Sequence, residues 1–226
     1  MSAEFDSYAA AYPKILDKAV RLAGDGSDYF AGIKTKYLAR KFGGSFSGKV
    51  LDFGCGVGLL SEFLLRDLPE CKLHGYDPSI SSLEHIKPEV YARGKFTARD
   101  SELETAYDLI AVSNVMHHIS VDERQEAILS LYNRLAPGGH LVIFEHNPAN
   151  PLTRWVVRMC AFDIGVTLLW PREVRKYFNC AGLHFAGLDY ITFFPRWLAW
   201  FRGLEPHLAW LPLGAQFAIV GSKSDR

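Results

Sequence analysis

The chain has 226 residues, with 25 Lys+Arg and 25 Asp+Glu, so its formal net charge is zero. This length predicts one domain or slightly more. The fractions of hydrophobic residues (49%) and charged residues (22%) are typical of a globular protein and exclude wholesale disorder. Because a protein that binds a phosphate backbone usually needs a basic face, the zero net charge argues against a nucleic-acid partner.

The cysteines and the termini bear on the cellular compartment. The four cysteines, Cys55, Cys71, Cys160 and Cys180, show no CxxC spacing and have mostly apolar neighbours, which predicts reduced, buried thiols. No N-terminal stretch resembles a signal peptide. No apolar run reaches about 18 residues without a charge, so we expect no membrane span. Together these features predict a cytoplasmic protein.

The predicted elements change in kind along the chain. Apolar residues at helical spacing predict two helices over residues 4–42, separated by glycines at 24 and 26. From Lys49 onward, strands alternate with helices, which predicts a mostly parallel sheet with helices on both faces. The expected strands are 50–53, 71–76, 95–98, 109–112 and 141–144, and the expected helices are 60–68, 79–86 and 121–135.

The last third of the chain is less regular. Its pattern predicts helices over 152–162 and 171–181, strands over 183–194 and 216–221, and a tryptophan-rich segment over 195–213. The chain shows no internal repeat and no interdomain linker, so we expect residues 1–226 to form a single domain. In parallel sheets, ligands bind beyond the carboxyl ends of the strands. Candidate site residues are therefore those that follow each strand.

A glycine cluster follows the first of these strands. Gly54, Gly56 and Gly58 alternate directly after Asp52-Phe53. Such glycines let the backbone turn sharply and approach a ligand, and they expose peptide N–H groups at a helix N-terminus. A plain turn would need one glycine. The dinucleotide-binding fingerprint GxGxxG fails, because Leu59 stands where its third glycine is required.

An aspartate ends the second strand. Asp77 lies 25 residues after Asp52. A carboxylate at this place can accept hydrogen bonds from both hydroxyls of a ribose. The alternative is that Asp77 caps the helix that begins near Ser79. Beside the glycine cluster, the ribose interpretation is favoured.

Three segments, 52–58, 75–79 and 135–139, resemble the signatures of class I S-adenosylmethionine-dependent methyltransferases, and the resemblance covers roughly residues 49–145. It implies an α/β, Rossmann-like fold: a seven-stranded, mostly parallel sheet with an antiparallel last strand and helices on both faces. S-adenosylmethionine would be the cofactor. Residues 1–45 would form an N-terminal helical cap, 46–146 the cofactor-binding core, and 147–226 the segments that cover the acceptor.

The resemblance also implies a set of cofactor-binding residues. Asp100 or Ser101 would contact the adenine, and Ser113 and Asn114 would border the methionine moiety. The full set is Tyr12, Lys34, Asp52, Gly54, Gly56, Asp77, Pro78, Asp100, Ser101, Ser113 and Asn114.

Two members of this set come from the N-terminal segment. By resemblance to small-molecule methyltransferases, Tyr12 closes over the methionine end of the cofactor. Lys34, or as a second choice Lys36, would pair with the methionine carboxylate, although a solvated helix face is the favoured interpretation of either lysine taken singly.

Candidate catalytic residues follow the fourth and fifth strands. His117, Glu145 and His146 would lie at the mouth of the site and could act as a base toward an acceptor hydroxyl or amine. A metal site is the competing interpretation. We expect no metal, because adjacent histidines point in different directions and no third ligand lies at a recognisable spacing. His118 is expected to be a packed residue.

The aromatic segment 193–211 favours a small acceptor. Its side chains could form a broad apolar wall, which suits an apolar or aromatic metabolite. A dimer interface and a weak contact with a membrane surface are alternatives, the latter because Arg196 and Arg202 lie among the aromatic residues. The chain is thus expected to be a monomer or a homodimer. The alternatives for its function are a nicotinamide-dependent oxidoreductase and a non-catalytic module that binds S-adenosylmethionine.

Overall fold

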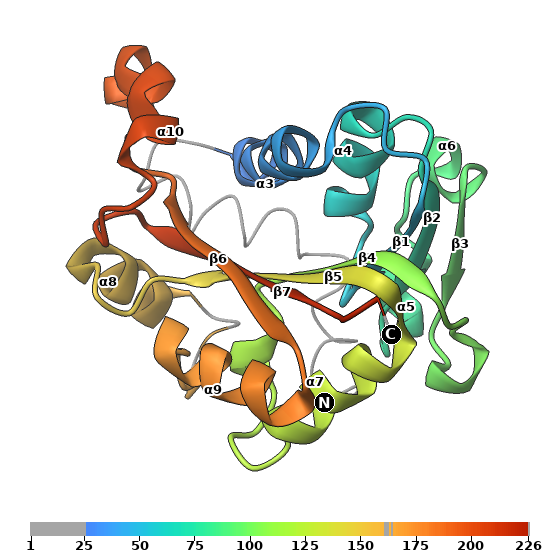
Figure 1. Cartoon of the computed structure of the whole chain (residues 1–226). Coiled ribbons are helices and arrows are strands. Elements are labelled where there is room, and N and C mark those ends of the chain that lie inside the picture. The colour runs from blue at the N-terminus through green and yellow to red at the C-terminus, as the bar shows by residue number, and fades with distance from the viewer. Residues whose placement is uncertain (1–25, 161–162, 164, 226) are drawn as a thin grey trace.

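The computed structural model describes residues 26–160, 163 and 165–225 and shows one seven-stranded sheet with helices on both faces (Figure 1). The strands lie in the order β3-β2-β1-β4-β5-β7-β6. β7 is antiparallel to both of its neighbours, and the other pairings are parallel. This topology confirms the predicted fold. The first predicted helix, with Tyr12, lies outside the described residues.

The strands agree with the predicted ones to within a few residues, apart from the start of β5. Their bounds are β1 Lys49–Phe53, β2 Lys72–Tyr76, β3 Gly94–Thr97, β4 Tyr107–Ser113, β5 Leu135–His146, β6 His184–Ile191 and β7 Gln216–Ser222.

Helices cover the two faces of the sheet. In Figure 1, α3 and α4 lie above it, and α7 and α9 lie below it. Within the described residues, no helix has both the length and the apolar character that crossing a bilayer requires. The helices are α3 Ser27–Phe42, α4 Leu59–Asp67, α5 Ile80–Leu83, α6 Pro88–Tyr91, α7 Arg124–Arg134, α8 Pro151–Met159, α9 Pro171–Ala181 and α10 Glu205–Leu208, with short 3-10 helices η3 Asp100–Glu102, η4 Met116–His118 and η6 Arg196–Leu204.

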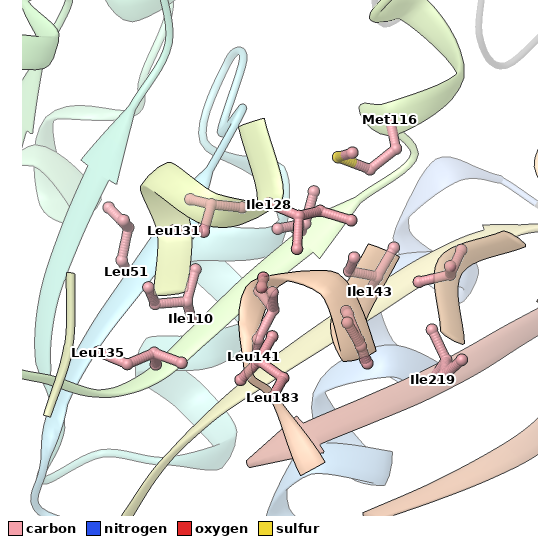
Figure 2. Close-up of a cluster of buried hydrophobic side chains, with 14 of the residues drawn as sticks. Leu51, Ile110, Met116, Ile128, Leu131, Leu135, Leu141, Ile143, Leu183 and Ile219 are labelled. Carbon is pink, nitrogen blue, oxygen red and sulfur yellow. The ribbon is translucent and has the colours of Figure 1, made fainter. Parts of the chain in front are cut away.

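Two apolar clusters sandwich the sheet. Successive side chains of a strand point to opposite faces. Leu51 and Ile110 therefore join the cluster under α7 and α9, which Figure 2 shows, whereas Val50 and Leu109 join the cluster under α3 and α4. Burial on both faces explains why these strands are continuous apolar runs rather than alternating ones.

The start of β5 differs from the prediction. The helix α7 ends at Arg134, and the strand begins at once with Leu135, through the Pro-Gly-Gly segment that was expected to separate them. The register against β4 shifts in this segment. Gly138 has a φ of 71°, and a Cβ on Gly139 would lie 2.7 Å from the Tyr107 carbonyl oxygen. The glycines thus form an irregularity within the strand rather than a break before it.

The cysteines also depart in part from the prediction. All four are free thiols, and Cys55, Cys71 and Cys160 are buried as expected. Cys180 is exposed, because it lies on the outer face of α9.

A buried arginine at the start of α7 connects this helix to the segment after α8. The Arg124 side chain is 1% exposed. It donates from Nε to the Ile119 carbonyl oxygen (3.0 Å) and from Nη2 to that of Thr167 (2.6 Å). We expect Arg124→Ala to lower the free energy of unfolding by about 2–4 kcal/mol, because it removes a buried side chain and leaves the buried Ile119 carbonyl oxygen and that of Thr167 without their charged donor.

Urea unfolding measures this loss. The matched control is Arg158→Ala on α8, whose side chain is exposed, and which should change stability by less than about 0.5 kcal/mol. Equal stabilities for the two variants would contradict the role given to Arg124.

Candidate active site

A pocket opens at the carboxyl ends of β1, β4 and β5. This is the point where the strand order reverses, at which open α/β sheets bind ligands. Walls from α3 and α8 complete it. Of the residues singled out in the sequence, those that line the pocket are Lys34, Asp52, Gly54, Gly56, Ser113, Asn114 and His146.

The glycine turn after β1 has the left-handed backbone that its composition predicts. The φ angles of Gly54, Gly56 and Gly58 are 78°, 53° and 77°. A Cβ on Gly54 would lie 2.3 Å from a methyl group of Val115, whereas a Cβ on Gly56 would meet nothing within 4 Å. Packing therefore requires glycine at position 54, and position 56 faces open space.

Contrary to the expectation from the sequence, the peptide N–H groups of this turn are not available to a ligand. Those of Gly54 and Cys55 donate to the Tyr76 carbonyl oxygen, at 2.7 and 2.9 Å. The Gly56 amide donates to Asp77 Oδ2 at 2.8 Å. These three N–H groups are engaged inside the protein, so the turn offers a ligand its lack of side chains rather than its amides.

Asp77 links the end of β2 to this turn. Besides Gly56, it accepts a hydrogen bond from the Ser79 amide at 2.9 Å. The cap of α5 is Ser79 itself, whose Oγ accepts from the Ser82 amide at 3.1 Å, so Asp77 does not cap α5. An ionised carboxylate can accept about four hydrogen bonds. The contact of Asp77 with a ribose stays a prediction.

Two buried ionisable groups face each other across the pocket. Lys34 is 3% exposed and donates from Nζ to Ser113 Oγ at 2.7 Å, so it is not on a solvated helix face. Burial lowers its pKa to about 8, against the attraction of Glu145 and Asp52. Asp52 is 1% exposed and accepts from Ser61 Oγ at 2.7 Å. Burial raises its pKa to about 7.

Behind the pocket, an imidazole lies between two carboxylates. His117 Nδ1 is 2.6 Å from Glu145 Oε2, and His117 Nε2 is 3.3 Å from Asp163 Oδ1. Glu145 also accepts from the Met116 amide at 2.8 Å. Burial alone would lower the pKa of His117, but Glu145 and Asp163 outweigh it and raise the pKa to about 9. At neutral pH this imidazole is a cation.

The histidine that lines the pocket has the opposite character. Burial, followed by the positive charge of His117, lowers the pKa of His146 to about 4. Its ring centroid lies 5.3 Å from that of His117. Of the three predicted catalytic residues, His146 alone lines the pocket, and His117 and Glu145 (3% and 0% exposed) lie behind it.

The sequence reasoning missed Asp163, which also lines the pocket. It lies 46 residues after His117, and no local spacing links the two. Ligand atoms of His117, His118 and Asp163 lie within 4.8 Å of one another, a geometry that could hold a metal ion. The paired histidines thus have a potential third ligand that no sequence spacing reveals, and the absence of a metal stays a prediction. A protonated His117 satisfies the same carboxylate.

The predicted adenine-binding residues lie away from this pocket. Asp100 and Ser101 are in η3, after β3. Asp100 Oδ2 is 2.6 Å from Arg134 Nη2, and the Asp100 side chain is 56% exposed. Pro78 follows Asp77 beyond β2. Their contacts with a cofactor remain predictions.

The imidazolium between two carboxylates should make stability depend on pH. Its pKa is about 9 in the fold and about 6.5 in an unfolded chain. Its contribution is therefore fully present below about pH 6.5 and is lost as pH rises through about 9. The difference in free energy of unfolding between the wild type and His117→Gln should shrink by on the order of 3 kcal/mol from pH 6 to pH 10.

Urea unfolding in the presence of EDTA, which removes bound cations, measures this difference. Lys34, whose lowered pKa acts in the opposite direction, is present in both proteins and cancels. Parallel pH profiles for the two proteins would show that His117 is not charged in the fold.

Comparisons with known proteins identify similar sequences and structures. A family model described as a methyltransferase domain matches residues 51–141. The ubiquinone biosynthesis O-methyltransferase of Photorhabdus laumondii is 26% identical over 122 residues, 48% of this chain and 47% of that protein. The ribosomal RNA small subunit methyltransferase C of Buchnera aphidicola is 29% identical over 115 residues, 47% of this chain and 34% of that protein. The chain thus spans about half or less of the length of these curated relatives.

Solved structures share the fold. The magnesium protoporphyrin IX methyltransferase of Synechocystis, with bound SAH, superposes with a TM-score of 0.64 and 17% identity, over 92% of this chain and 86% of that one. A SAM-dependent methyltransferase of Archaeoglobus fulgidus gives a TM-score of 0.66 and 16% identity, over 88% and 95%. Residues 51–141 thus match a methyltransferase domain, and the sheet topology is the fold that the SAM-dependent methyltransferase structures share.

Proposed function

We propose that the protein transfers a methyl group from S-adenosylmethionine to a small apolar or aromatic acceptor. The observation that carries this proposal is the composition of the pocket. The polar side chains of Asp52 and Ser113 lie at the strand ends, the buried Lys34 reaches them from α3, and apolar side chains of α8 line the same pocket. One side suits a zwitterionic cofactor, and the other suits an apolar acceptor.

The residues of the pocket fit the cofactor. When bound, S-adenosylmethionine supplies a methyl group that its sulfonium makes electrophilic. Lys34 would hold the carboxylate of the methionine moiety, since its buried ammonium forms no ion pair with a described carboxylate. Asp52 would face the cationic groups, which would favour its ionised form. Gly56 would let the cofactor approach the backbone. A Cβ at this position would project into open space, and its absence leaves that space to the cofactor.

The acceptor side is apolar. Leu152, Val156 and Val157 of α8 and Phe30 of α3 line it. Such a wall binds an apolar or aromatic body and excludes water, which favours transfer between two groups that are held in line. The name of the relative from ubiquinone biosynthesis is consistent with such an acceptor. The relative named for ribosomal RNA points to a nucleic acid, against which the zero net charge and the apolar wall both argue.

We propose that His146 takes the acceptor's proton. It lines the pocket and, with a pKa near 4, is neutral at physiological pH, so its lone pair can accept a hydrogen bond from a hydroxyl or amine. Burial, followed by the cation at His117, makes His146 a weaker base than a free imidazole, which suits an acceptor with an acidic hydroxyl such as a phenol. His117 and Glu145 then act as positioning residues rather than as groups that touch the acceptor.

The alternatives remain to be separated by experiment. A nicotinamide-dependent oxidoreductase lacks support, since Leu59 replaces the third glycine of the dinucleotide fingerprint. A non-methylating role needs a direct test, because the same fold occurs in the cyclase SpnF, with a TM-score of 0.61 and 15% identity. Transfer of a radiolabelled methyl group to a panel of apolar phenols and quinols, with ribosomal RNA as the comparison, distinguishes these functions. Labelled RNA with unlabelled phenols and quinols would overturn the proposed acceptor class.

The open space at Gly56 gives a test of the cofactor site. We expect Gly56→Ala to weaken binding of S-adenosylmethionine at least about tenfold, because the new methyl group enters the space that the cofactor needs. The matched control is Gly43→Ala, at a position that also has a positive φ (91°) and open surroundings. Calorimetric titration should show unchanged affinity in the control. Equal affinity in both variants would mean that Gly56 serves only the turn.

Removal of the proposed base should affect the chemical step. We expect His146→Ala to lower kcat by roughly 10²–10⁴-fold, with the affinity for S-adenosylmethionine nearly intact. The control is His140→Ala, a histidine six residues earlier on the same strand that does not line the pocket, which should leave kcat unchanged. Wild-type kcat for His146→Ala at saturating acceptor would show that catalysis rests on positioning alone.

A further inference from the structure

Large apolar side chains are exposed at one end of the molecule. Trp197, Trp200 and Trp210 are 76%, 79% and 74% exposed, and Leu204 and Leu213 are 50% and 59% exposed. They belong to η6 and to the turn between α10 and β7, and this segment projects from the sheet beside α3 (Figure 1). Three tryptophans this exposed, so close in sequence, are more than the scattered apolar residues that protein surfaces normally carry.

The helix α8 extends this apolar surface. The Asn150 side chain at its N-terminus donates to the Leu213 carbonyl oxygen at 2.7 Å, which holds α8 beside the projection. On α8, Leu152, Trp155 and Met159 are 55%, 46% and 63% exposed. We call the two groups together the tryptophan face, which comprises Leu152, Trp155, Met159, Trp197, Trp200, Leu204, Trp210 and Leu213.

The projection is held in a defined conformation. Glu205 Oε1 accepts hydrogen bonds from the amides of Phe193 and Phe194, at 3.0 and 3.1 Å. Arg202 donates to the Phe194 carbonyl oxygen at 3.1 Å, and its guanidinium lies 3.7 Å from the ring centroid of Tyr29 on α3. The polar groups are thus used internally, which leaves the apolar side chains outside.

The two segments that carry the tryptophan face hold mainly positive charge. Arg154 and Arg158 of α8 and Arg196 of η6 are exposed. Within residues 150–160 and 193–213 the only carboxylate is that of Glu205, which is bonded to backbone amides. Because the whole chain has zero net charge, the positive charge of this face is local.

We propose that the tryptophan face docks onto the surface of an anionic lipid bilayer. Tryptophan rings favour the boundary between lipid and water, where the ring is buried and its N–H stays hydrated. Arginines beside them pair with anionic headgroups. A second copy of the chain fits less well, since a symmetric contact through this face would bring like-charged arginines together without carboxylates to pair them.

The docked face adjoins the pocket. Leu152 belongs both to the tryptophan face and to the pocket wall, so the two surfaces are continuous. A bound bilayer would therefore lie at the entrance on the acceptor side. That consequence rests on the proposed function, whereas docking itself does not, and it can be measured without cofactor or acceptor.

Flotation with lipid vesicles tests the proposal on the full chain. We expect the wild type to bind vesicles of phosphatidylglycerol and phosphatidylcholine, to bind pure phosphatidylcholine at least about fivefold more weakly, and to bind less as salt is raised. The double variant Trp197→Ala/Trp200→Ala should lower the partition coefficient at least about tenfold. Its control is Tyr91→Ala, a 52% exposed aromatic residue on α6, which packs at the β3 edge of the sheet, opposite β6.

A charge reversal tests the electrostatic part. Arg158→Glu should weaken binding to the anionic vesicles about fivefold or more, whereas Lys72→Glu, an equal change in net charge at the exposed start of β2, should not. Circular dichroism verifies that each variant is folded.

Three results would overturn the proposal. The first is no binding to anionic vesicles, or equal binding to neutral ones. The second is an unchanged partition coefficient in the tryptophan double variant. The third is a dimer in sedimentation that the double variant converts to a monomer while vesicle binding is absent, which would assign the face to a contact between copies.

Discussion

The hydrogen bond from the Gly56 amide to Asp77 is the interaction on which the arrangement of the site depends. It joins the turn after β1 to the residue after β2, so the ends of two neighbouring strands form one rigid rim. The left-handed backbone of the turn sends the chain back as α4, against which α3 packs. That packing brings Lys34 over the strand ends. The placement of β1, β2, α3 and α4 around the site thus depends on a short glycine segment.

The electrostatics of the pocket follow from where water is excluded. Burial moves the pKa values of Lys34 and Asp52 toward neutrality from opposite sides, to about 8 and about 7. At neutral pH Lys34 therefore keeps most of its positive charge, whereas Asp52 is ionised only in part, and a zwitterionic ligand would favour the charged form of both groups. Behind them, His117 keeps its charge because two carboxylates flank it. The charged His117 thus lies behind the pocket, whereas Lys34 and Asp52 line it and change their charge with what is bound.

Local patterns predicted what local physics decides. The helix 171–181 begins at a proline and ends before a glycine, and the structure has α9 at these bounds. The glycine turn and Asp77 could likewise be predicted, because a few neighbouring residues determine where a strand ends and how sharply the backbone can turn. What could not be predicted depends on tertiary contacts. Asp163 reaches His117 only through the fold. The start of β5 is set by pairing with β4, which overrides the usual meaning of Pro-Gly-Gly.

The antiparallel placement of β7 has a further consequence. Ile191 and Gln216 are register partners, so the segment between them leaves the sheet and returns to it at the same place. Ala215 and Thr192 close its base with a backbone hydrogen bond of 2.9 Å. A loop with adjacent ends can change length or composition at little cost to the framework that carries it. Residues 193–214 are thus an exchangeable module, through which evolution or a protein engineer can change the surroundings in which this fold works while the cofactor end stays as it is.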